Sequence, residues 1–109
     1  MALRGNRVGV VDTDIPSPGI HSLLGLEPEQ THATLNNYLW GERPIEDVTY
    51  NVSASLSKEE SGQLFLIPSS IKPDDIARIL QQGYDVKLMN DGLRQFVKSY
   101  QLHYLGLAG

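Results

Sequence analysis

The sequence contains no cysteine, which excludes both disulfide bonds and thiolate metal sites. It also has no dense run of Lys or Arg, and its net charge of −4 is spread along the chain. Because nucleic-acid binding depends on clustered positive charge, we expect no direct contact with nucleic acid. No long apolar stretch follows residues 1–5, so we expect neither a secretory signal nor a transmembrane segment, and we predict a cytoplasmic protein.

The composition that remains is typical of a globular α/β protein. Of the 109 residues, 40% are hydrophobic and 20% are charged, which is enough apolar material for one modest core. A chain of this length leaves a large share of its surface in water, so a piece of a larger sheet would be only marginally stable. We expect residues 1–109 to form a single, partial domain.

Two short apolar runs predict buried strands, at residues 7–12 and 64–67. Neither run alternates with polar residues, which is typical of parallel strands buried on both faces. The second run is ended by Pro68, Ser69 and Ser70, and a third strand is expected to begin at Tyr104. Strands that alternate with helices indicate an α/β layer built on a parallel sheet.

Helical patterns occupy most of the sequence between these strands. We expect helices beginning at Thr34, Pro44, Pro73 and Asp85, whereas residues 49–62 are polar and predict an irregular, exposed loop. The core positions expected on the last two helices are Ile76, Ile79, Leu80, Val86, Met89, Leu93, Phe96, Val97 and Tyr100.

Two carboxylates, Asp12 and Asp14, follow the first predicted strand. In parallel α/β sheets, ligands bind beyond the carboxyl ends of the strands. Paired acids at such a position suit a magnesium site or the orientation of an attacking water. The alternative is that both residues merely end the strand and stabilise the next turn, and the spacing alone leaves both interpretations open.

Several further residues have a structural and a functional interpretation. Ser69 and Ser70 either face a ligand or cap the turn before Pro73, and we favour the capping role. Tyr38 and Trp40 either contact a partner or, as is commoner for aromatic residues at helical spacing, complete the core. The three histidines lack the spacing of a zinc pair, so we expect surface or loop positions for His21, His32 and His103.

Taken in order, these segments resemble the second strand and switch segment of the ParA/MinD family of deviant Walker ATPases, and the features that follow them. The matching segments are residues 8–14 (VGVVDTD), 17–21 (SPGIH), 23–26 (LLGL), 34–39 (TLNNYL) with Gly41, 44–48 (PIEDV) and 64–70 (LFLIPSS). The resemblance extends over nearly the whole chain, and its specificity lies in the combination of the segments.

The resemblance implies part of a three-layer P-loop NTPase domain, with a parallel sheet flanked by helices. It implies ATP and Mg²⁺ as cofactors, a homodimer closed around two nucleotides, an activator protein, and partitioning or positioning of cargo. By position, Asp14 matches the switch aspartate associated with the hydrolytic water, and Asp12 matches the acid near Mg²⁺ and the lysine of the phosphate-binding loop. Ser17, Pro18 and Gly19 match the mobile part of the switch.

The sequence also departs from the family. It contains no G-x-x-x-x-G-K-[ST] loop, which the resemblance places before residue 1, and residues 105–109 supply no Walker B aspartate. We therefore expect a fragment that does not bind ATP tightly or hydrolyse it alone. A non-catalytic α/β interaction module remains an alternative. A receiver-like signalling domain is less favoured, because the second strand ends without an acceptor aspartate.

Overall fold

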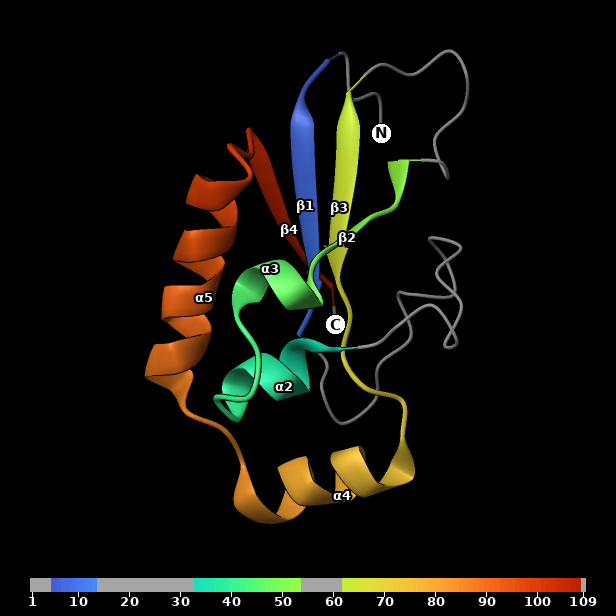
Figure 1. Ribbon diagram of the computed structural model, residues 1–109, viewed down its shortest axis with the longest axis vertical. Helices are drawn as coiled ribbons and strands as arrows, with labels where there is room; N and C mark the ends of the chain where they lie inside the picture. The colour runs from blue at the N-terminus through green and yellow to red at the C-terminus, as the bar shows by residue number, and fades with distance from the viewer. Residues whose placement is uncertain (1–4, 14–32, 54–61, 109) are drawn as a thin grey trace.

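The computed structural model describes residues 5–13, 33–53 and 62–108, which alternate between strands and helices (Figure 1). This alternation confirms the predicted α/β class. In chain order, the elements are β1 (Arg7–Asp12), α2 (Leu35–Leu39), α3 (Ile45–Val48), β2 (Tyr50–Asn51), β3 (Gln63–Ile67), α4 (Pro73–Gln82), α5 (Val86–Ser99) and β4 (Tyr104–Ala108).

The strands form one sheet in the order β2-β3-β1-β4. β1 lies between β3 and β4 and is parallel to both, with Val11 level with Ile67 on one side and Leu107 on the other. β2 pairs with β3 in the antiparallel direction. The uninterrupted apolar sequence of β1 follows from this central position, where side chains on both faces are covered.

The interpretation of residues 49–62 as an irregular, exposed loop is wrong for its first part. Tyr50 and Asn51 form β2, and Val52 is buried against Val8 and Leu64. The loop was predicted from the many serines and charged residues of this stretch. The pattern that indicates a strand is short, with only Tyr50 and Val52 in alternation. Residues 54–61 lie outside the described part of the chain.

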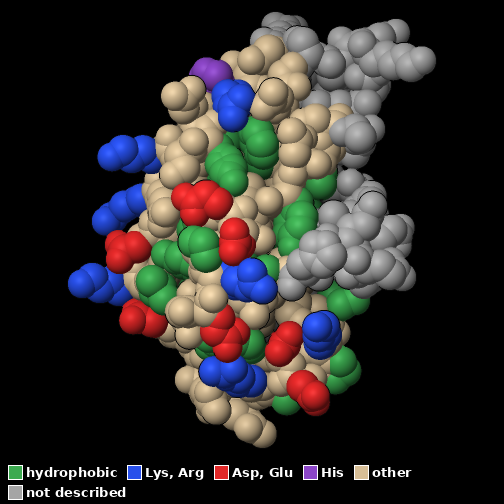
Figure 2. All heavy atoms as spheres, viewed as in Figure 1, with side chains coloured by type: hydrophobic (Ala, Val, Ile, Leu, Met, Phe, Trp, Pro, Cys, Tyr) green, Lys and Arg blue, Asp and Glu red, His purple; other side chains and the backbone are tan. Residues whose placement is uncertain are grey.

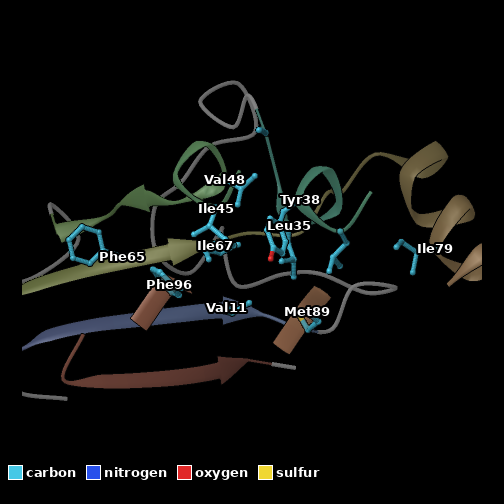
Figure 3. Packing of buried hydrophobic residues seen from close by; sticks show 12 residues of the cluster. Val11, Leu35, Tyr38, Ile45, Val48, Phe65, Ile67, Ile79, Met89 and Phe96 are labelled. Carbon is cyan, nitrogen blue, oxygen red and sulfur yellow. The ribbon is translucent and has the colours of Figure 1, made fainter. Parts of the chain in front are cut away.

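α2, α3 and α5 pack on one face of the sheet, where they form most of the main core, and α4 adds Ile79 to this core from beyond the carboxyl ends of the strands (Figure 3). Val11, Phe65 and Ile67 supply the strand side of this core. The helical side chains buried there are Leu35, Tyr38, Leu39, Ile45, Val48, Ile79, Met89 and Phe96. A smaller cluster on the opposite face consists, among the described residues, of strand residues and Val52.

The last two helices confirm part of the predicted core. Ile79, Met89 and Phe96 are buried, but Leu80 is 68% exposed and Val86 63% exposed. Successive residues of a helix point about 100° apart, so Leu80, next to the buried Ile79, lies outside the narrow stripe that faces the core. Val97, next to Phe96, is exposed for the same reason. Val86 is the first residue of α5 and lies one turn before the buried Met89. Asp85 caps α5 as predicted, accepting hydrogen bonds from the backbone N–H groups of Lys87 and Leu88.

Two glycines allow α5 to lie close to its neighbours. A Cβ atom at Gly9, in the middle of β1, would lie 2.7 Å from the Phe96 ring. A Cβ atom at Gly92, on α5, would lie 2.5 Å from Cε2 of Tyr38. Real Cβ atoms do not approach other atoms so closely, so any larger residue at either position must displace an aromatic ring or the helix.

Acidic and basic side chains are interspersed on the face of the molecule seen in Figure 2, without a cluster of one sign. None of the helices in the described ranges is long and apolar enough to cross a membrane.

Candidate functional site

The carboxyl ends of β1 and β3 lie side by side, because the two strands are parallel and in register. Asp12 ends β1, and residues 68–70 leave β3 at the same edge. α2 and α4 are next to this edge of the sheet (Figure 1). The structure thus places Asp12 where the sequence predicts a ligand edge.

Asp12 is almost completely buried, with 2% of its surface exposed. Its backbone carbonyl oxygen accepts a hydrogen bond from the Ser69 hydroxyl at 2.7 Å. The next residue, Thr13, is partly buried. Burying a carboxylate costs free energy unless polar groups surround it, so a buried Asp12 is unusual at the end of a strand.

The two serines after β3 have different partners. The Ser70 hydroxyl lies 2.6 Å from Oδ2 of Asp75 and accepts a hydrogen bond from the Lys72 N–H at 3.2 Å. These contacts stabilise the turn into α4, which confirms the predicted capping role for Ser70. For Ser69 that prediction is wrong, because its hydroxyl donates to β1.

Asn36, on α2, joins the helix to the same turn. It is fully buried, and its Oδ1 accepts a hydrogen bond from the Ser70 N–H at 2.8 Å. The neighbouring Leu35 N–H donates to the Pro68 carbonyl, also at 2.8 Å. Sequence reasoning missed Asn36. The available signal was weak: asparagine is a poor helix former, and here it stands between the apolar positions 35 and 38.

The buried polar side chains of the described residues gather at this edge. We call them the carboxyl-edge cluster: Asp12, Thr34, Asn36, Ser69 and Ser70. Thr34 precedes α2 as predicted, and its N–H donates to the Asn37 side chain at 2.9 Å. The cluster offers one carboxylate, and the part of the chain that the structure describes contains no group of three or more potential metal ligands. A magnesium ion could therefore be held here only with additional ligands or through water.

The remaining predicted site residues, Asp14, Ser17, Pro18 and Gly19, lie outside the described residues, and their roles stay predictions. His21 and His32 lie outside them too. His103 is exposed at the opposite edge of the sheet, where its Nδ1 accepts a hydrogen bond from the Arg7 N–H at 2.8 Å.

Tyr38 belongs to the core, as the commoner interpretation of its position predicts. Its ring is buried, and its hydroxyl donates to the Leu88 carbonyl at 3.1 Å. Burial raises the pKa of Tyr38 above its ordinary value, and the nearby negative charge of Asp91 adds to this effect. Trp40 is half-buried and lies beneath the guanidinium of Arg78, 3.9 Å from the ring centroid.

Comparison with solved structures identifies the fold. The chain superposes on the cell division ATPase MinD of Pyrococcus furiosus with a TM-score of 0.68 and 19% identity. It also superposes on the septum site-determining protein MinD of Pyrococcus horikoshii, solved in complex with Mg-ADP, with a TM-score of 0.68 and 17% identity. Both matches include 97% of this chain, which spans only 39% and 38% of the two MinD chains. No family model matches the sequence, and no curated protein matches it significantly. The predicted resemblance to ParA/MinD proteins is confirmed at the level of the fold.

Proposed function

We propose that this chain is the part of a ParA/MinD-type ATPase that contributes the acidic switch segment to ATP-Mg²⁺ binding and hydrolysis. The observation that carries the proposal is the buried Asp12 at the carboxyl end of the central strand, in a sheet that matches MinD. The Mg-ADP in the Pyrococcus horikoshii protein supports a magnesium nucleotide as the ligand class.

Enzymes that transfer phosphoryl groups act mainly through positioning and electrostatic stabilisation. Asp14 orients the attacking water in this proposal, and Asp12 lies near the metal and the phosphate-loop lysine. Ser17, Pro18 and Gly19 belong to the switch in this proposal and contribute to nucleotide binding. When bound, Mg²⁺ neutralises charge that develops on the phosphate oxygens.

The residues of the carboxyl-edge cluster fit a magnesium ion held through water, because carboxylate and hydroxyl oxygens are suitable partners for its hydration shell. The phosphates themselves need a cradle of backbone N–H groups, which the missing glycine-rich loop supplies in this family. The 109-residue chain should therefore bind ATP-Mg²⁺ negligibly by itself. Homodimerisation, an activator protein and movement of cargo in the cytoplasm belong to the same proposal and follow only once the loop is present.

Two measurements test the proposal. In calorimetry, saturable binding of ATP-Mg²⁺ to the 109-residue chain at micromolar nucleotide would contradict the fragment interpretation. In a protein that unites this chain with the phosphate-binding loop, Asp14→Ala should slow single-turnover hydrolysis while equilibrium ATP binding is kept. Asp12→Ala should weaken nucleotide binding as well.

The non-catalytic interaction module is the second candidate, and the absence of a G-x-x-x-x-G-K-[ST] sequence from these 109 residues favours it. It predicts that neither aspartate variant changes nucleotide binding or turnover in the united protein. If the Asp14→Ala variant hydrolysed ATP at the parent rate, the result would favour the interpretation that Asp12 and Asp14 only end the strand.

A further inference from the structure

The two edges of the sheet differ in length. β2, at one edge, has two residues, whereas β4, at the other edge, has five (Figure 1). Very short edge strands are one way in which proteins prevent pairing with other chains. Among the described residues, β1 is the one strand that pairs with β4, so no described strand lies along the outer side of β4.

The hydrogen bonds of β1 show which of its residues face β4. The Gln63 N–H donates to the Asn6 carbonyl at 3.1 Å, so the even-numbered residues along β1 direct their main-chain groups toward β3. Successive residues of a strand direct these groups to opposite sides, so the odd-numbered residues face β4. The hydrogen bond from the His103 N–H to the Arg7 carbonyl at 2.7 Å agrees with this assignment.

Leu105 and Leu107 hold the outward main-chain groups of β4. In a parallel pair, a residue that faces the neighbouring strand directs its N–H and C=O groups at the two residues that flank its partner. Gly9 is level with Leu105, so its groups are directed at Tyr104 and Gly106. The N–H and C=O groups of Leu105 and Leu107 consequently point away from β1.

The side chains of β4 are apolar, and several are exposed. Leu105 packs against the main core, and Leu107, two positions later on the same face, is 58% exposed. Tyr104, on the other face, is 60% exposed. Residues 102–109 contain no Asp, Glu, Lys, Arg or Pro, the residues with which proteins keep edge strands from pairing. β4 thus has the composition of an interior strand at an edge position.

We infer that β4 is an interaction surface for a second copy of this chain, paired antiparallel about a twofold axis at Gly106. A twofold axis perpendicular to the sheet makes the two adjacent strands antiparallel and keeps the helices of both copies on one face. Leu105 then lies level with Leu107 of the partner subunit, and these two residues exchange main-chain hydrogen bonds. The axis repeats the pair on its other side, so every outward N–H and C=O group of Leu105 and Leu107 has a partner.

Self-complementarity favours a second copy over a different partner. The outward groups require an extended main chain, and β4 itself supplies one in a matching register. The pairing places the exposed Leu107 beside Leu105 of the partner subunit, and apolar pairs of this kind stabilise sheets. Gly106 lies opposite Gly106 of the partner subunit, so no side chains meet at the axis, and the uncharged residues 102–109 bring no like charges together. This contact needs no nucleotide and is therefore distinct from the homodimer of the proposed function.

Sedimentation equilibrium of the 109-residue chain without nucleotide tests the pairing. Two five-residue strands bury less than the roughly 800 Å² per partner of a standard interface, so the dimer should be weak, and its population should rise between about 10 µM and 1 mM chain. Association should stop at the dimer, because the pairing uses the outer side of β4 in both copies. A monomer throughout this range, or growth to larger oligomers, would overturn the inference.

A matched pair of lysine variants locates the contact. Leu107→Lys places a charge at the pairing edge and should raise the Kd of the dimer at least about tenfold. Leu80→Lys changes a residue of α4 that is 68% exposed and lies outside β4, so the Kd should stay within about twofold of the parent value. Equal effects of the two variants would assign the association to general hydrophobicity and would contradict a contact through β4.

Hydrogen exchange of the parent chain tests which groups pair. The Leu105 and Leu107 amides should exchange rapidly at low concentration and at least about fivefold more slowly as the dimer forms. The Tyr104 and Gly106 amides face β1 and should be protected at every concentration. Concentration-independent protection of the Leu105 and Leu107 amides would show that the chain itself covers this edge, and the inference would fail.

A peptide with the sequence of residues 102–109 is a second probe, which requires no variant of the chain. The peptide should bind β4 and lower the dimer population. N-methylation at Leu105 of the peptide removes a donor that the pairing uses and should abolish this competition. N-methylation at Gly106 alters an amide that points away from the chain and should be tolerated. Equal competition by the two methylated peptides would refute the proposed register.

Discussion

The amino end and the carboxyl end of β1 make different kinds of polar contact with the segments around them. At the amino end, Arg7 donates from its Nη1 to the Gln63 side chain at 2.7 Å and from its backbone N–H to Nδ1 of His103 at 2.8 Å, both in exposed positions. Its Nε donates to the Tyr100 carbonyl in a part-buried position. At the carboxyl end, Asp12, Ser69, Ser70 and Asn36 make their contacts in buried positions.

This difference separates two kinds of polar contact. Water competes with the exposed hydrogen bonds of the amino end, so each stabilises the fold little and can be lost at small cost. Buried contacts at the carboxyl end hold one geometry, because a polar group that loses its partner there has no substitute. A buried polar edge is thus more typical of a site whose geometry has to be fixed than of a strand that merely stops.

The largest effect should come from Phe96 of α5. Its side chain is fully buried against the middle of β1, between the two ends of the sheet. Phe96→Ala should lower the free energy of unfolding by about 3–5 kcal/mol in a denaturant titration, because it leaves a cavity in the main core. Val97→Ala is the matched control on the exposed side of α5 and should cost far less. Near-parent stability of Phe96→Ala would show that the two ends do not depend on a common core.

A direct test of the comparison removes one side chain from each end. Asn36→Ala should cost about 1–3 kcal/mol of unfolding free energy, because the buried Ser70 N–H loses its acceptor. Gln63→Ala removes the exposed partner of Arg7 and should change stability by less than about 0.5 kcal/mol. Equal costs in parallel denaturant titrations would break the distinction between the ends.

Tyr38 sharpens the comparison, because its hydroxyl joins α2, at the buried end, to α5. Tyr38→Phe should cost about 0.5–1.5 kcal/mol near neutral pH. Because the pKa of Tyr38 is raised in the folded protein, the unfolded chain loses this proton first, and the parent loses stability as the pH rises above 10. The parent's advantage over Tyr38→Phe should therefore shrink between pH 9 and 11, measured by titrations at several pH values. A constant difference would contradict the assigned burial.

The smallest effect is expected at Leu80, which the sequence placed in the core and the structure exposes. Leu80→Ser should change the unfolding free energy by no more than about 0.5 kcal/mol. Ile79→Ser, one position earlier on α4, serves as the buried control. A loss of several kcal/mol in the Leu80 variant would restore the original interpretation of the helix.

The sequence allowed the principal strands and the longer helices to be predicted because their signals are local. β1 and β3 are short apolar runs, and α5 begins at a residue, Asp85, whose side chain caps it. Which residues of a helix face the sheet depends on packing between distant segments, and for this reason Leu80 and Val86 were misplaced. β2 was missed since a two-residue strand gains its stability from pairing with β3 and has almost no pattern of its own.

The candidate site divides in the same way. The rule for parallel sheets was sufficient to locate Asp12 at the ligand edge. The hydrogen-bond partners at that edge were not predictable, because they are far apart in the sequence. Ser69 lies 57 positions after Asp12, whose carbonyl it binds, and Asn36 lies 34 positions before Ser70, whose N–H donates to it. The serines also showed that adjacent residues of one type can serve different neighbours, β1 for Ser69 and α4 for Ser70.

The glycines at positions 9 and 92 have a mechanical consequence. The Phe96 ring, together with Leu102, fills the place of a side chain at Gly9 of β1, and the Tyr38 ring fills the place of a side chain at Gly92 of α5. α5 therefore has a projecting ring in a recess of the sheet and receives a projecting ring from α2. Sliding the helix along its axis would move both rings away from the glycines and against residues that carry side chains, so close packing resists shear along this interface. A shift of α5 along its axis is therefore coupled, through these two rings, to the positions of β1 and α2.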